Sequence, residues 1–210
     1  SKEYFRKLAF MVPTGLEKEG IFCIGIQRFN RATGEDVTEY IRQIQEYSGE
    51  TGLIIDLRGN PGGPPLAARE ISGFFLEPGD DFAYFQRRGY PRSMLDIPQL
   101  PADDRYRGDM VILIDEESGS ASELFSGILQ RRGRAQLMGT SSAGQVFLKS
   151  MYHLSDGSMV LLVTARGHHP DGTVFSFDGL TPDIPADRDQ DGDELIRYAA
   201  RYLLEKRKAR

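Results

Sequence analysis

The feature that most constrains this chain is a pattern that occurs twice: an apolar run of strand length, a turn containing glycine, and a segment with helical spacing. Residues 53–57 precede the first turn, at 58–63, and residues 110–114 precede the second, which ends in Gly119 and Ser120. Apolar runs of this kind are typical of strands that a parallel sheet buries on both faces. The sequence therefore predicts an α/β fold in which each turn follows the carboxyl end of a strand, where such sheets bind their ligands.

Further strands and helices surround these two units. Residues 21–28 predict a buried strand parallel to 53–57, and an amphipathic helix opens at 33–36 between them. Residues 77–107 are rich in Pro, Gly and charge, so we expect a surface excursion over the site with one strand at 82–85. The other expected elements are helices at 66–75, 121–130 and 193–206 and short strands near 135–138, 146–153 and 159–165.

Composition favours a single globular core. The chain has 210 residues, of which 40% are hydrophobic, enough to bury one domain. We assign residues 20–210 to this core, with its C-terminal helix, and residues 1–19 to an N-terminal segment whose first 12 residues have helix-like apolar spacing. The net charge of -5 and the scattered basic residues argue against a nucleic-acid partner. No apolar run reaches the roughly 18 residues that cross a bilayer, and no signal-peptide pattern occurs.

Ser120 stands directly before the helix expected to begin near Ala121. With Glu123 it forms the Ser-x-x-Glu pattern of a capping box, which by itself accounts for both residues. The same position places the hydroxyl at the positive end of a helix dipole, and the N–H of Ala121 would point toward an oxyanion formed by attack of Ser120 on a carbonyl. In the first turn, Gly62 and Gly63 would let a substrate carbonyl approach the backbone and find a second oxyanion donor. An ordinary helix cap and an ordinary turn are the alternative interpretation.

Four segments resemble, in the same order, landmarks of the carboxyl-terminal processing (tail-specific) serine proteases. They are the Asp-Leu-Arg-x-Asn-Pro-Gly-Gly element at 56–63, the Gly-Ser-Ala-Ser-Glu motif at 119–123, and the segments at 164–172 and 179–184. The resemblance implies a ClpP/crotonase-like α/β core, which we predict carries an additional short-stranded β region. It also implies hydrolysis of a peptide or protein substrate through an acyl-enzyme on Ser120, no metal or cofactor, and an extracytoplasmic location such as the bacterial periplasm or cell envelope.

Gln145 departs from the family at the position where the resemblance places the lysine general base. A neutral amide cannot accept the serine proton, so the chain is an inactivated form, a natural pseudoenzyme, or a member of a subgroup that recruits its base elsewhere. Lys149 lies on the same strand face, but four strand residues displace it by about 13 Å, so it replaces the base only if the register shifts. His153, His168 and His169 qualify only through tertiary proximity.

The leading functional prediction is a serine endopeptidase of the tail-specific type. The alternatives are a catalytically silent peptide-binding or scaffolding protein that retains the fold, and a crotonase-like acyl-CoA enzyme, in which the Ser-Ala-Ser-Glu element would have no role. The family usually carries a peptide-binding PDZ module, and the 19 residues before the core are too few for one. Oligomer formation is left open.

An acidic pattern near the end of the chain imitates the start of a calcium loop. Asp187, Asp189 and Asp191 have the required spacing, but Tyr198 occupies the twelfth position, where such loops place a glutamate. We interpret these residues as acidic groups at the N-terminus of the last helix, where the helix dipole favours them, and predict no metal.

Overall fold

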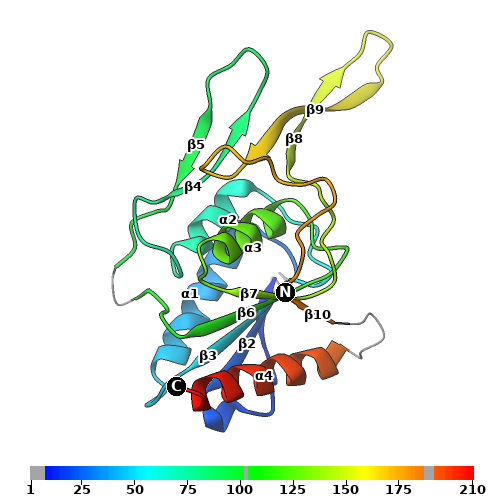
Figure 1. The fold of residues 1–210 in the computed structure, drawn as a ribbon. Coiled ribbons are helices and arrows are strands. Elements are labelled where there is room, and N and C mark those ends of the chain that lie inside the picture. The colour runs from blue at the N-terminus through cyan, green and yellow to red at the C-terminus, as the bar shows by residue number, and fades with distance from the viewer. Residues whose placement is uncertain (1–7, 102–103, 187–191) are drawn as a thin grey trace, which may run out of the picture.

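The computed structural model describes residues 8–101, 104–186 and 192–210, and its centre is a six-stranded sheet (Figure 1). The strand order is β1-β2-β3-β6-β7-β10, with β1 antiparallel to β2 and the other neighbours parallel. In this order the strands are β1 (Ala9–Val12), β2 (Ile21–Ile26), β3 (Gly52–Asp56), β6 (Asp109–Ile114), β7 (Gln136–Gly139) and β10 (Ile184–Pro185). The predicted α/β class and the parallel pairing of β2 with β3 are confirmed.

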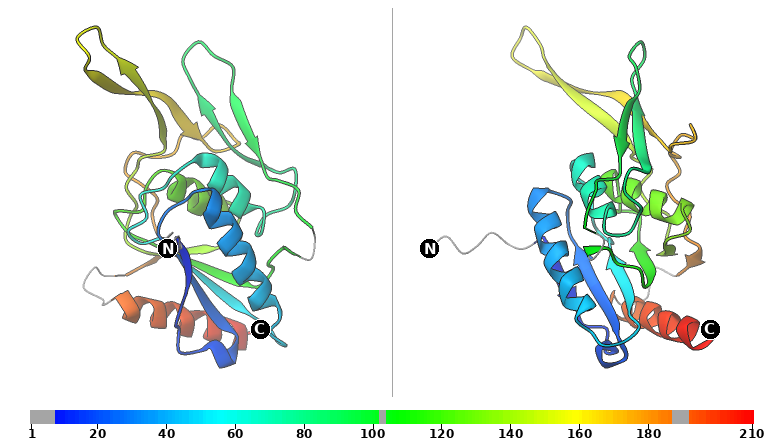
Figure 2. Two further views of the ribbon diagram at one scale, coloured as in Figure 1. Left: turned by 180° about the vertical axis from the view of Figure 1, so that it is seen from behind. Right: turned by 90° about the vertical axis from the view of Figure 1, so that its left-hand side faces the viewer.

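Helices cover both faces of this sheet, which explains its continuous apolar strands. α1 (Arg31–Gln45), α2 (Pro65–Ser72) and α3 (Ala121–Arg131) pack on one face, and α4 (Gly192–Lys208) packs on the other (Figure 2). Because successive strand residues point to opposite faces, Leu53 and Ile55 belong to the cluster beneath α1 to α3, whereas Ile54 belongs to the cluster beneath α4. A short 3-10 helix, η1 (Glu17–Glu19), joins β1 to β2.

A second, four-stranded antiparallel sheet projects from the helical side of the first (Figures 1 and 2). Its order is β5-β4-β9-β8, and it forms two hairpin arms that extend beyond the helices. We call it the arm sheet, and its β8–β9 hairpin the arm. The strands are β4 (Asp81–Gln86), β5 (Ser93–Asp96), β8 (Phe147–His153) and β9 (Met159–His168). The predicted short-stranded region is therefore a separate sheet, to which the excursion at 77–107 contributes β4 and β5.

Three expectations about individual elements need correction. The helix suggested by the spacing at 1–12 is wrong over residues 9–12, because these residues form a strand that pairs with the edge of β2 and buries Ala9 completely. Residues 1–7 lie outside the described part. α1 begins at Arg31 instead of 33–36, since the Asn30 side chain caps it by accepting the Thr33 N–H at 2.9 Å. β5 was not expected.

The acidic pattern at 187–191 lies outside the described residues. None of the helices in the described ranges has the length and apolar character that a membrane crossing requires.

Candidate active site

The turn after β3 and the turn before α3 form one hydrogen-bonded unit. Their strands end at the same edge of the sheet, since Asp56 pairs with Leu113 in the β3–β6 register. The carbonyl of Asn60 accepts the Gly119 N–H at 3.0 Å and the Ser122 hydroxyl at 2.9 Å. The two glycine-containing turns therefore lie side by side, and each holds the other in place.

Ser120 occupies a backbone conformation that is rare for a residue with a side chain. Among the described residues it is the one non-glycine residue with positive φ, at 55°. Strained conformations of this kind cost of order 1–3 kcal/mol and cluster at functional sites. Gly62 makes the close approach of the other turn feasible, because a Cβ there would lie 2.8 Å from the Ser120 Cβ and 2.7 Å from the Ala121 nitrogen. The fold thus tolerates a strained backbone that holds a half-buried hydroxyl at the start of a helix.

Backbone amides next to Ser120 differ in their availability. The Gly62 N–H donates to the Asn60 side chain at 2.8 Å, which leaves it occupied. The Gly63 N–H has no hydrogen-bond partner in the part of the chain that the structure describes. Ala121 is the first residue of α3, and the leading amides of a helix have no partner within it. Of the predicted oxyanion donors, Gly63 and Ala121 are therefore the ones with an N–H to offer.

Glu123 connects the turn at Ser120 to the loop that carries Gln145. Its carboxylate is 1% exposed and accepts four hydrogen bonds. One oxygen accepts the N–H groups of Ser120, at 2.8 Å, and Gln145, at 2.7 Å; the other accepts the Ser142 hydroxyl and the Gly144 N–H, each at 2.7 Å. The capping-box pattern predicted the contact with Ser120, but no sequence signal predicted the contacts with the later loop.

A cleft of about 280 Å³ opens at this point, between α3 and the base of the arm sheet. Ser120 and Gly63 line it together with Gln145, so the predicted site residues lie together even though they come from three separate segments. The exposed side chain of Gln145 has no hydrogen-bond partner among the described residues. The full lining is Pro61, Gly63, Pro65, Phe85, Ser120, Leu124, Gln145, Val146, Phe147, Leu148 and Lys149.

None of the three histidines lines this cleft. His168 stacks on Tyr84 with ring centroids 4.7 Å apart, and His169 stacks on Phe175 at 3.8 Å. Burial, with a smaller contribution from the Arg131 charge, lowers the pKa of His169 to about 4. His168 and His169 therefore belong to the packing around β9 and the turn that follows it, and His153 is exposed at the end of β8.

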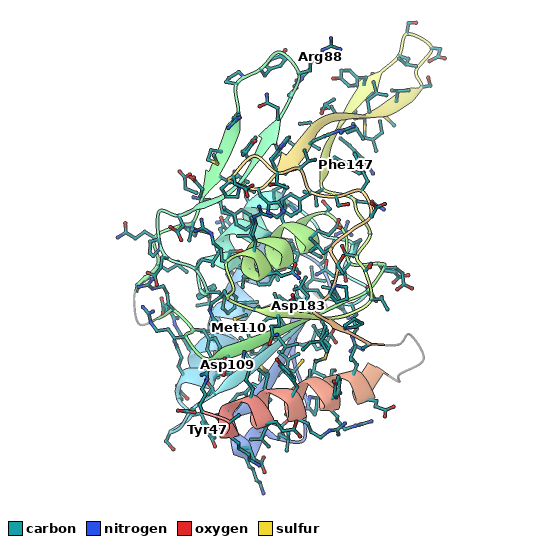
Figure 3. The ribbon with its side chains drawn as sticks, viewed as in Figure 1. Tyr47, Arg88, Asp109, Met110, Phe147 and Asp183 are labelled. Carbon is teal, nitrogen blue, oxygen red and sulfur yellow. The ribbon has the colours of Figure 1, made fainter. Side chains whose placement is uncertain are left out.

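A larger cavity lies at the other end of the molecule. It measures about 420 Å³, and Tyr47 and Asp109 are among its lining residues. Figure 3 places these two residues near α4, at the opposite end of the structure from Phe147, which lines the cleft beside Ser120. Volume alone would have selected the wrong cavity, whereas the strained serine and the unpaired amides select the smaller one.

Comparisons with known proteins find relatives that are processing proteases. Two sequence relatives are the carboxyl-terminal-processing protease of Synechocystis, 30% identical over 79% of this chain and 38% of its own length, and CtpA of Bacillus subtilis, 26% identical over 78% and 34%. Among solved structures, the photosystem II D1 C-terminal processing protease superposes with a TM-score of 0.70 and 22% identity over 86% of this chain and 46% of that one. The tricorn protease gives a TM-score of 0.61, with 22% identity, over 92% of this chain and 18% of that one.

The chain thus spans well under half the length of these curated relatives. A family model described as "Peptidase family S41" matches residues 20–186, most of the chain. The order of the turn motifs, the fold and the sequence relatives lead to one assignment: this chain belongs to Peptidase family S41, whose members among its relatives are carboxyl-terminal processing proteases.

Proposed function

We propose that this chain is the catalytic part of a serine endopeptidase that cleaves peptide or protein substrates through an acyl-enzyme on Ser120. The observation that carries the proposal is the strained backbone of Ser120, at φ 55°, in a cleft that also presents the Gly63 amide. The hydroxyl oxygen attacks the carbonyl carbon of the scissile bond. The N–H groups of Gly63 and Ala121 then stabilise the oxyanion, and Gly62 keeps the two turns close enough for both to reach it.

The same residues suggest how a peptide would lie. Phe85, Leu124 and Val146 give the cleft apolar walls beside Ser120, which suits an apolar side chain next to the scissile bond. Glu123 fixes the loop at 142–145 against the nucleophile helix, so this wall is rigid before substrate binds. By the same family membership, we place the enzyme outside the cytoplasm.

Gln145 supports a second candidate function. It brings a neutral, exposed amide to the family's base position, and an amide cannot accept the serine proton. A protein that binds peptides in this cleft without cleaving them would have the same fold and the same turns.

Labelling by a fluorophosphonate probe separates the two candidates, because the probe reacts only with an activated serine. The enzyme proposal predicts labelling of the chain at Ser120, located by mass spectrometry of the digested protein and abolished by Ser120→Ala. Unlabelled protein that still binds peptides in fluorescence anisotropy would favour the binding function. Labelling that survives Ser120→Ala would reject Ser120 as the nucleophile.

A further inference from the structure

One side chain in the cleft can do what Gln145 cannot. Of the eleven residues that line the cleft, all within the described ranges, only Lys149 carries a basic nitrogen. Gln145 and Ser120 line the same space. Lys149 is therefore the candidate for the missing base among the residues that line the cleft.

The strand that carries Lys149 is irregular at this residue. A regular strand would displace it by about 13 Å from position 145. The β8–β9 pairing is not regular, because Leu148 pairs with Ala165 and Lys149 pairs with Val163, which leaves Thr164 as an extra residue on β9. A bulge of this kind bends the strands and increases their twist. The pairing register thus changes at Lys149, and this residue lines the same cleft as Ser120.

The direction of the Lys149 side chain supports the same conclusion. Its ammonium nitrogen lies 5.0 Å from the centroid of the Phe147 ring, and Phe147 itself lines the cleft. Residues two apart in a strand share a face, so the side chain runs along that face toward the start of β8. The ammonium therefore lies beside Phe147, back along β8 on the side of the cleft, and not out along the exposed arm.

We infer that Lys149 is the general base of this enzyme, in place of the lysine that the family carries at position 145; the inference rests on the proposed function of Ser120. The neutral Lys149 amine takes the hydroxyl proton of Ser120 while the serine oxygen bonds to the scissile carbonyl carbon and the carbonyl electron pair moves onto oxygen. The resulting ammonium returns that proton to the leaving nitrogen as the carbon–nitrogen bond breaks. Water then repeats both transfers on the acyl-enzyme, which releases the acid and restores the amine and the Ser120 hydroxyl.

Gln145 offers an amide oxygen and an amide nitrogen at the mouth of the same cleft, which suits it to orient the Lys149 amine or the serine hydroxyl. Gln145 is therefore a positioning residue in this scheme.

The test compares rates of fluorophosphonate labelling in the unaltered chain, Lys149→Met, Lys149→Arg, Gln145→Lys and Gln145→Lys/Lys149→Met. Loss of a general base typically costs 10²- to 10⁴-fold, so both single changes at Lys149 should slow labelling by at least about 100-fold. Arginine keeps the charge but does not give up its proton, so it separates basicity from charge. The double variant should recover labelling, because it returns a lysine to position 145.

Other outcomes distinguish failure of this inference from failure of the proposed function. If Lys149→Met is labelled at the unaltered rate, Ser120 remains a competent nucleophile and Lys149 is not its base. If only the Gln145→Lys variants are labelled, the unaltered chain is not an active peptidase, and both the proposed function and the inference fail. If no variant is labelled, or labelling survives Ser120→Ala, the proposed function fails and takes the inference with it. Lys149 is exposed, so its variants should retain the melting temperature of the unaltered chain.

Chemical rescue provides a matched second measurement. Lys149→Cys should be inactive and should regain labelling after alkylation with 2-bromoethylamine, which rebuilds an amine at the end of a lysine-length side chain. Alkylation with iodoacetamide, which adds a neutral amide, should restore nothing. The native thiol, Cys23, is 0% exposed and therefore protected from both reagents. Equal rescue by the two reagents would overturn the inference.

Discussion

The two sheets of this protein differ in how much of each strand is covered. In β6, the central strand of the main sheet, every residue from Met110 to Ile114 is buried. In β8 of the arm sheet no residue is fully buried, and in β9 Leu161, Leu162 and Val163 are each more than half exposed. The main sheet is packed on both faces, whereas in the four-stranded arm sheet β4 is buried and the β8–β9 hairpin is largely exposed to solvent.

The candidate active site lies where these two regions meet. Ser120 and the amides of Gly63 and Ala121 come from turns fixed by the core, whereas Gln145 and Lys149 come from the root of the arm. Substitutions in the arm cost little packing, so a lysine and a glutamine there can change without loss of the fold. The turn at Ser120 has no such freedom, because glycines and buried hydrogen bonds determine its shape.

The largest effect that would test this comparison is expected in the core. Phe125 is 0% exposed and contacts the rings of Phe29 and Phe75, with centroids 5.8 and 5.9 Å away. Phe125→Ala should lower the free energy of unfolding by about 4 kcal/mol, as large-to-small changes in buried aromatic positions do. Urea denaturation measures it, with Tyr152→Ala in the arm as the matched aromatic control. Equal losses at both sites would contradict the distinction between the two sheets.

A somewhat smaller effect is expected where the two regions join. Glu123→Gln keeps the size of the side chain but replaces one accepting oxygen with a donor, so at least one of the four N–H or O–H groups around it loses its partner. We expect a loss of roughly 3 kcal/mol in the free energy of unfolding and slower labelling of Ser120. Glu35→Gln, on the exposed face of α1, is the control and should change neither. A Glu123 variant as stable as the control would mean that the junction is not held by this carboxylate.

The same contrast explains which parts of the fold could be predicted from sequence. Strands of the core are buried on both faces, and this requires a continuous apolar run such as the one at 110–114. β5 (Ser93–Asp96) carries no such signal, because it forms only by pairing with β4. β1 has the apolar spacing of a helix, and it forms a strand because it pairs with the edge of β2, a tertiary contact that its own sequence does not encode.

The candidate site divides in the same way. Local turn chemistry singles out Ser120, Ala121, Gly62 and Gly63. The structure brings these residues together, and their catalytic roles stay a prediction. The bulge beside Lys149 could not be predicted, since the extra residue that creates it is Thr164 on the partner strand. The sequence spacing of one strand contains no information about an insertion in its neighbour.

A pH-dependent effect of intermediate size is expected where the arm sheet returns to the core. His169 is 7% exposed and its pKa is lowered to about 4, chiefly by burial, so the folded chain holds it neutral while the unfolded chain takes up a proton below about pH 6.5. Stability is therefore lost as the pH falls through this window, by about 2 kcal/mol between pH 7 and pH 5. His169→Phe, which preserves the stacking on Phe175, should remove that part of the loss in urea denaturation at the two pH values. His153→Phe, at an exposed position in β8, should leave the pH dependence as it is; if both variants behave alike, His169 is not the titrating group.

The smallest change in the free energy of unfolding is expected in the arm sheet, at an exposed side chain whose truncation should hardly matter. Leu161 is 59% exposed, whereas Leu113 in β6 is 0% exposed. Leu161→Ala should change the free energy of unfolding by less than about 0.5 kcal/mol, because an exposed side chain gives up little burial when it is truncated. Leu113→Ala should cost about 3 kcal/mol, since it leaves a cavity in the core. A cost above about 1.5 kcal/mol for Leu161→Ala would mean that the arm buries this side chain in solution, and the contrast between the two sheets would then not hold at this position.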